Sequence, residues 1–292
     1  MTMQIRFWGV RGSIASPGPE TAKVGGNTSC VEVVCGESRL ILDAGTGLRR
    51  LGDAMMARRM PVDATILLSH FHWDHIQGLP FFAPAYVPST KLTIVGGANG
   101  VMSLRDTLAH QMTEPVFPVR LDELGACITT KDVRQGESFD VGSATVTVAK
   151  GNHPGGVHAY RIEYEGRSMV FATDTEHFAC VDPQLCSLSL GADVLIYDSQ
   201  YTPEEYSGKV GWGHSTYVAG AELARSAGVR RYVLFHHDPR RTDEQVVEVE
   251  ARARELFGES VAAREGMEIE IHGEACPTPS TRNRDLVSPR AA

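Results

Sequence analysis

The chain has 292 residues, of which 42% are hydrophobic, and a formal net charge of −8. This length suits one large domain or two small ones, and the hydrophobic fraction is ordinary for a globular protein. No apolar run approaches the roughly 20 residues of a membrane-spanning helix, and the N-terminus does not resemble a signal peptide. We therefore expect a cytoplasmic protein with no membrane partner. The acidic balance argues against a large nucleic-acid partner, which favours a basic surface.

Six cysteines are scattered along the chain without a CxxC pair. A disulfide framework is not expected in a chain of this length that lacks an export signal. We interpret these residues as small buried hydrophobic side chains or as unreactive thiols. They are Cys30, Cys35, Cys127, Cys180, Cys186 and Cys276.

The first part of the chain reads as strands separated by glycine-containing turns. Apolar alternation predicts a strand over 5–10, and the segments 31–35 and 39–42 flank a hairpin turn at Gly36. A short helix fits 47–56. Further strands are predicted over 64–68, 91–95, 144–148, 159–163, 168–172 and 192–197.

The last third contains two well-marked helices. Thr242-Asp243-Glu244-Gln245 is a capping-box pattern, after which apolar residues repeat at helical spacing up to Gly258. A second helix is expected from Ser215 to Gly228, and a strand over 231–235 lies between the two. From about residue 273 the sequence has no periodicity. We therefore expect one domain over 1–272 and a flexible tail over 273–292.

The most informative segment is Ser69-His70-Phe71-His72-Trp73-Asp74-His75, which directly follows the predicted strand 64–68. Alternation along an extended turn points His70 and His72 in the same direction, and Asp74 and His75 can then face a second point nearby. Neutral imidazole and carboxylate groups are good ligands for zinc and similar divalent ions. A single loop histidine is usually solvated, but four potential ligands at this spacing indicate a metal site.

The HxHxDH spacing resembles the signature of the metallo-β-lactamase superfamily, and three later segments resemble the rest of that signature in the same order. They are Asn152-His153-Pro154, Ala172-Thr173-Asp174-Thr175 and Leu234-Phe235-His236-His237-Asp238-Pro239. The resemblance covers about residues 5–271. It implies an α/β (α+β) fold, in which two sheets lie face to face in a four-layer αββα sandwich with the metal loops at one edge.

The resemblance also implies two divalent metal ions per chain, with zinc preferred and manganese or iron as alternatives. By analogy the ligands are His70, His72 and His153 at one ion and Asp74, His75 and His236 at the other, with Asp174 bridging them. We favour His236 over His237, because it directly follows the predicted strand and its offset from His214 resembles that in the tRNase Z branch. Taken alone, His153 could be an ordinary loop histidine and Asp174 a turn cap.

Asp43 matches an aspartate that superfamily members carry near the metal loop. We interpret it as an anchor for the ligands rather than a ligand. Two metal ions can share a hydroxide and bind the oxygens of a phosphodiester or an ester. A carboxylate that contacts both metal and water can orient that nucleophile, and Asp74 is the first candidate, with Asp174 second.

The segment 211–216 resembles the histidine motif of the phosphodiesterase and tRNase Z branch. At the start of the predicted helix, His214 can act on a phosphate group as a catalytic residue. The competing interpretation is a residue that merely neighbours the helix cap. The segments 7–13 and 197–201 resemble bacterial metal-dependent hydrolases described as cyclic-nucleotide-phosphodiesterase-like.

The sequence lacks the long glycine- and proline-rich basic arm with which tRNase Z holds a tRNA. We therefore expect a small phosphodiester substrate, such as a 3′,5′-cyclic nucleotide. The segments 80–84 and 115–118 could form aromatic pocket walls or pack in the core. Hydrolysis of a small ester, lactone or thioester is the alternative, and a non-catalytic metal-binding scaffold is the alternative from another class. The oligomeric state stays open between monomer and homodimer.

Overall fold

The structure is a computed structural model that describes residues 2–97 and 102–272. Within these residues the chain forms two seven-stranded mixed sheets. The first sheet has the order β14 (Glu268–His272), β1 (Thr2–Gly9), β2 (Cys30–Cys35), β3 (Ser38–Leu42), β4 (Asp63–Leu67), β5 (Lys91–Gly96) and β6 (Cys127–Asp132). The second has the order β13 (Ser260–Ala262), β12 (Arg231–Phe235), β11 (Val194–Asp198), β10 (Arg167–Ala172), β9 (Val157–Tyr164), β8 (Ala144–Gly151) and β7 (Ser138–Val141).

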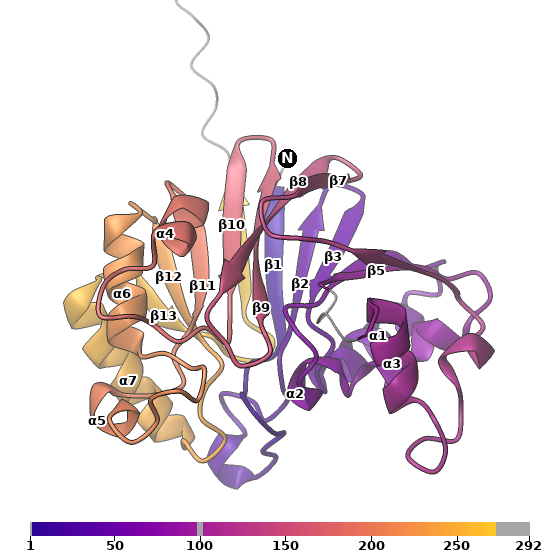
Figure 1. Ribbon diagram of the computed structural model, residues 1–292, viewed down its shortest axis with the longest axis horizontal. Coiled ribbons are helices and arrows are strands. Elements are labelled where there is room, and N and C mark those ends of the chain that lie inside the picture. Colours follow the sequence, from indigo (N-terminus) through magenta and orange to yellow (C-terminus); the bar gives the residue numbers. More distant parts are fainter. Residues whose placement is uncertain (1, 98–101, 273–292) are drawn as a thin grey trace, which may run out of the picture.

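Helices cover the outer faces of both sheets (Figure 1). The first sheet is covered by α1 (Gly47–Ala57) and α3 (Leu104–Gln111), and the second by α4 (Pro183–Ser189), α6 (Tyr217–Ser226) and α7 (Asp243–Leu256). The short helices α2 (Trp73–Ile76) and α5 (Pro203–Tyr206) lie in loops, as do the 3-10 turns at Pro19–Thr21, Leu79–Phe81, Ala83–Tyr86 and Leu121–Glu123. The predicted αββα sandwich is thus confirmed.

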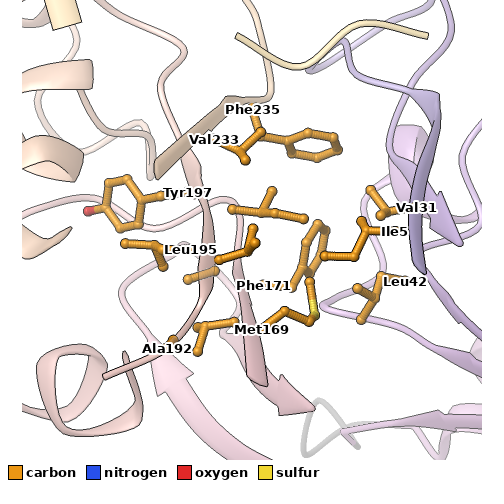
Figure 2. Close-up of a cluster of buried hydrophobic side chains, with 14 of the residues drawn as sticks. Ile5, Val31, Leu42, Met169, Phe171, Ala192, Leu195, Tyr197, Val233 and Phe235 are labelled. Atoms are coloured by element: carbon orange, nitrogen blue, oxygen red, sulfur yellow. The ribbon is translucent and has the colours of Figure 1, made fainter. Parts of the chain in front are cut away.

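Alternating side chains of the strands build the two sides of the core. Leu42 of β3 packs between the sheets, whereas its neighbour Ile41 packs with the helices outside the first sheet. Figure 2 shows Ile5 and Leu42 of the first sheet facing Phe171 of the second. The rings of Phe171 and Phe235 meet edge to face, with centroids 5.5 Å apart. All residues of β10 and β11 are buried, as expected for central strands covered on both faces.

The direction of the strands determines where the polar loops gather. Strands β3 to β6 run parallel to one another in the first sheet, and β10 to β13 do so in the second. Because parallel strands end at the same edge of a sheet, the loops that follow them lie side by side. Asp43 and His70 follow β3 and β4, and Asp174, Asp198 and His236 follow or end β10, β11 and β12.

The strands and helices predicted from the sequence are all present, with ends shifted by a few residues. Strands β6, β7, β13 and β14 and several short helices were not predicted from the sequence. Strand β6 has no fully buried residue, because it lies at the edge of its sheet and therefore lacks an apolar signature.

The five cysteines within the described residues are free, as expected. Cys30 and Cys35 are buried, whereas Cys127 and Cys180 are exposed. Cys276 and the predicted flexible tail, residues 273–292, lie outside the described residues. No helix in the described part of the chain is both long and apolar enough to cross a membrane.

Phe171→Ala should destabilise the protein by about 3–5 kcal/mol, because it leaves a cavity between the sheets that close packing cannot refill. The matched control is Phe178→Ala, since Phe178 is 50% exposed. Chemical denaturation followed by circular dichroism would give both values. Equal, small shifts for the two variants would contradict the inter-sheet core described here.

Candidate metal centre

The HxHxDH segment lies where β4 ends and the chain turns into α2. His72 is extended, with φ −63° and ψ 150°, and directly precedes α2. Asp74 and His75 lie within that helix and are buried. The backbone of the turn is held in place, since the Ala44 amide donates to the His75 carbonyl at 2.8 Å.

Three histidines form the first cluster, defined as His70, His72 and His153, with one nitrogen of each within 4.8 Å of the others. The His153 Nε2 lies 3.1 Å from the His72 Nδ1, and the His153 Nδ1–H donates to the Gly213 carbonyl at 2.8 Å. Burial and the neighbouring imidazoles lower the pKa of all three rings. These shifts favour the neutral form of each ring, which is the form that binds a metal ion.

Four buried residues form the second cluster, defined as Asp74, His75, Asp174 and His236. The His75 Nε2 lies 3.1 Å from Asp74 Oδ2 and 3.3 Å from Asp174 Oδ1. The His236 Nε2 lies 3.2 Å from each of the same two oxygens. The other oxygen of Asp174, Oδ2, is 3.8 Å from the His70 Nε2, so this carboxylate reaches both clusters.

The donor set fits divalent metal ions. The Nε2 atoms of His70 and His75 are buried and have no hydrogen-bond partner within the described residues. Burial opposes ionisation of Asp74, yet His75 and His236 hold the pKa of its carboxyl group far below the usual range. Orphaned imidazole nitrogens that face ionised carboxylates at short range are the ligand chemistry of zinc and related ions.

Asp43 anchors the second cluster from behind. Its Oδ2 accepts from the His75 Nδ1–H at 2.7 Å and from the Ser29 hydroxyl at 2.9 Å, while its Oδ1 accepts from the Ser69 amide at 2.8 Å. This contact places the proton of His75 on Nδ1 and leaves Nε2 open toward the cluster. Asp43 thus occupies the anchoring position that the sequence suggested.

The structure places His236, rather than His237, in the cluster. The His236 Nδ1–H donates to the Gln200 side-chain oxygen at 2.8 Å, which turns Nε2 toward Asp74 and Asp174. His237 instead donates through Nε2 to the Ala263 carbonyl at 2.9 Å and belongs to neither cluster. A Cβ on Gly12 would overlap the His236 ring, so only glycine fits there.

Three residues at the centre have left-handed backbone conformations, which residues other than glycine rarely adopt. The φ values are 62° for Asp43, 50° for Asp174 and 60° for His236. Such conformations cost on the order of 1–3 kcal/mol each and persist where the surrounding structure over-determines them. Each of the three lies one or two residues after the end of a strand, and the sharp turn there directs the side chain into the centre.

His214 lies beside the second cluster, at the turn that leads into α6. Its Nδ1–H donates to Asp198 Oδ2 at 2.9 Å. Burial lowers the pKa of the imidazole, but the Asp198 carboxylate outweighs this and raises the pKa to about 9. His214 also forms a third group with Asp174, Asp198 and His236, whose possible ligand atoms all lie within 4.8 Å. The geometry alone is therefore compatible with a ligand or with a residue that acts on substrate.

Asp198, Gln200 and Ser13 had no role predicted from the sequence, although each orients a residue of the centre. Asp198 holds His214 and also accepts from the Ser215 amide at 3.2 Å. The Ser13 amide donates to Asp74 Oδ2 at 2.7 Å. The sequence does contain a signal for Asp198, because Asp198 ends an apolar strand just as Asp43 follows one.

An open hollow of about 500 Å³ leads from solvent to the centre. Its walls are Ser13, Phe71, His72, Trp73, Asp74, Asp174 and His214. Trp73 is 77% exposed and forms an aromatic rim. The aromatic segments suggested as pocket walls lie elsewhere: Phe82 is fully buried in the core, and the rings of Phe81 and Phe117 meet edge to face with centroids 5.6 Å apart.

Comparison with known proteins identifies the family. A family model described as "Beta-lactamase superfamily domain" matches residues 38–237. Ribonuclease Z from Mycobacterium sp. (strain KMS) is 25% identical over 284 residues, covering 91% of this chain and 96% of that protein. Ribonuclease Z from Lacticaseibacillus casei (strain BL23) is 26% identical over 275 residues, covering 79% and 85%.

Solved structures share the fold at low sequence identity. The metallo-beta-lactamase fold protein YhfI from Bacillus subtilis has a TM-score of 0.70 and 20% identity over 92% of this chain and 99% of its own. A diphosphatase from the PhnP family has a TM-score of 0.68 and 17% identity, with coverage of 92% and 98%. Human tRNase Z, short form, has a TM-score of 0.62 and 21% identity, with coverage of 91% and 98%. The matched family model spans the HxHxDH segment, His153, Asp174 and His236, and the chain therefore belongs to the metallo-β-lactamase superfamily of metal-dependent hydrolases.

Proposed function

We propose that this protein hydrolyses a small phosphodiester, such as a 3′,5′-cyclic nucleotide, with two divalent metal ions that are preferably zinc. The proposed ligands are the first cluster for one ion and the second cluster for the other, with Asp174 shared between them. The observation that carries the proposal is His214, which lines the same hollow as Asp74 and Asp174 and is hydrogen-bonded from behind by the buried Asp198 carboxylate. A phosphodiester needs such a proton donor, because its alkoxide leaving group is poor.

Bound divalent ions supply Lewis acidity and a nucleophile at neutral pH. The side chains of the protein position the attacking water and the leaving group. Asp74 is held by the Ser13 amide at 2.7 Å, so its carboxylate can accept a hydrogen bond from the attacking water and orient it. The Asp198 carboxylate holds the Nδ1–H of His214 and leaves Nε2 as the nitrogen that can protonate the leaving oxygen or bind a phosphate oxygen.

A second candidate is cleavage of a phosphodiester in RNA. The relatives that favour it are proteins named ribonuclease Z, which this chain matches over most of its length. Against it stand the net charge of −8 and the absence of a basic arm from the sequence. The expectation that a large nucleic acid is not a substrate gains no support from these relatives, so RNA belongs in the substrate test.

The substrate test measures initial rates of the metal-loaded protein on one panel. The panel contains 3′,5′-cyclic AMP, bis(4-nitrophenyl) phosphate, a precursor tRNA with a 3′ extension, a lactone and a thioester. We expect turnover of the two small phosphodiesters. Turnover of the precursor tRNA alone would select the second candidate, and turnover of the lactone or thioester alone would refute both.

Elemental analysis of undepleted protein should show about two divalent ions per chain. Asp74→Ala should lose the ion of the second cluster and most turnover, because it removes a carboxylate ligand and leaves His75 and His236 facing one charge fewer. Asp53→Ala, which removes an exposed carboxylate on α1, is the matched control. Unchanged metal content and activity in Asp74→Ala would remove Asp74 from the ligand set.

His214→Ala should lower kcat by about 10²–10⁴-fold while the metal content stays the same. The loss should be large for a diester with an alkyl leaving group and small for an activated aryl diester, which needs little protonation. His110→Ala, at an exposed site on α3, serves as the control. A fall in metal content would instead make His214 a ligand, and equal losses on both substrates would point to phosphate binding.

Asp43→Asn should weaken metal binding about 10–100-fold, because the neutral amide no longer holds the proton of His75 on Nδ1. Competition with a chelator measures this affinity directly. Far-ultraviolet circular dichroism checks that the sheets remain folded. Unaltered affinity would show that the orientation of His75 does not depend on the Asp43 charge.

A further inference from the structure

A second hollow opens from the first cluster on the side of β8 and β9. Its volume is about 680 Å³, and it shares Phe71 and His72 with the hollow that leads to His214. His70 and His72 form part of its wall, together with two basic side chains and a third histidine. We call it the cationic groove and define it by Arg134, Lys150 and His158.

The charges of this groove are unbalanced. Neither the guanidinium of Arg134 nor the ammonium of Lys150 has an ion pair or hydrogen bond with the described residues, and both side chains are exposed. No acidic residue is found among the described residues that line the groove. The neighbouring Lys131, in contrast, pairs with Glu137 at 3.5 Å. In a chain with net charge −8, two unpaired cations beside the metal centre form a local positive field.

Other hollows on the described surface do not combine unpaired cations with a wall free of acidic side chains. The one beside α1 contains Arg49, which pairs with Asp53 at 3.2 Å, and the buried carboxylate of Glu265. The one beside α3 mixes arginines with several acids, and there Arg120 pairs with Asp122 at 2.9 Å. The cationic groove therefore stands apart by its charge as well as by its continuity with the first cluster.

Two further features suit the groove to an anionic group. The His158 Nδ1 is buried and has no hydrogen-bond partner within the described residues, while the His158 amide donates to the Ser69 carbonyl at 2.8 Å. Gly155 and Gly156 line the groove with φ values of 85° and 89°, a left-handed conformation that favours glycine. Because these residues have no side chains, their backbone faces the groove directly. A ligand can approach the backbone closely there.

We propose that the cationic groove binds a second anionic group of the substrate, namely a phosphate monoester attached to the molecule whose diester is hydrolysed at the two clusters. This proposal rests on the proposed function and narrows its substrate class to phosphorylated phosphodiesters. A phosphate dianion matches the planar fork of Arg134 and the point charge of Lys150 better than a neutral sugar or base does.

The kinetic test compares two substrates with the same diester and the same leaving group. They are thymidine 5′-(4-nitrophenyl phosphate) and its 3′-phosphorylated derivative, and the metal-loaded protein releases 4-nitrophenol from both. We expect kcat/KM to be about 5- to 50-fold higher for the 3′-phosphorylated substrate, mainly through a lower KM. Arg134→Ala and Lys150→Ala should each lower this ratio, and Lys150→Glu should bring it below one.

Lys131→Ala is the matched control, because Lys131 is a nearby lysine that pairs with Glu137 and does not line the groove. It should keep the wild-type ratio. A ratio near one in the wild type would overturn the proposal. So would an unchanged ratio in the Arg134 and Lys150 variants, or equal losses in the control.

A binding test separates this proposal from the proposed function. Isothermal titration calorimetry of the metal-loaded protein compares adenosine 3′,5′-bisphosphate with adenosine 5′-monophosphate, and no turnover of a diester is needed. The wild type should bind the bisphosphate about 5- to 50-fold more tightly, and the Arg134→Ala/Lys150→Ala double variant should bind both ligands alike. If no diester is hydrolysed but this preference holds and is lost in the double variant, the groove proposal stands and the proposed function fails. A preference that is missing, or that survives in the double variant, refutes the groove proposal.

Discussion

The structure depends on one electrostatic contact between its two halves. His75 comes from the loop after β4 of the first sheet, and Asp174 and His236 come from the loops after β10 and β12 of the second. The Nε2 atoms of His75 and His236 lie 3.3 Å and 3.2 Å from Asp174 Oδ1, and all three side chains are buried. Buried carboxylates are costly unless they are paired. The two sheets must therefore meet in one register for each carboxylate to find its imidazoles and, when bound, its metal ions.

A carboxylate that orients a histidine of the centre occurs once in each sheet. Asp43 follows a parallel strand of the first sheet, and it holds the Nδ1–H of His75 and the Ser69 amide. Asp198 ends a parallel strand of the second sheet, and it holds the Nδ1–H of His214 and the Ser215 amide. In each case one carboxylate orients an imidazole and also satisfies the backbone of the loop that carries the motif. The carboxylates at the strand ends thus fix the positions of the His75 and His214 rings.

Two hollows meet at His72, and their chemistry differs. The hollow toward His214 has an aromatic rim and a carboxylate-supported imidazole, which suits the reacting part of a substrate. The cationic groove has unpaired positive groups and bare glycine backbone, which suits a group that is held but does not react. Specificity within a superfamily with one fold resides in such flanking surfaces rather than in the shared ligand cluster.

Local sequence determined much of this protein. The spacing of His70, His72, Asp74 and His75 predicted a compact ligand group, because neighbours along an extended turn and a first helical turn stay together in any fold. Strands with continuous apolar runs and the helix that begins at Thr242 were also predictable, since periodicity and capping are local signals. Polar edge strands such as β6 were not predicted, because they bury no apolar face.

Only the tertiary structure decided which distant residues share the centre. His236 and His237 are adjacent in sequence, and the left-handed turn at His236 together with the Gln200 contact directs one ring inward and leaves the other on Ala263. The role of Asp198 and the cationic groove likewise arise from separate segments that meet only in the folded chain. Apart from the position of Asp198 at the end of an apolar strand, neither leaves a local signal in the sequence, because the contacts join separate segments of the chain.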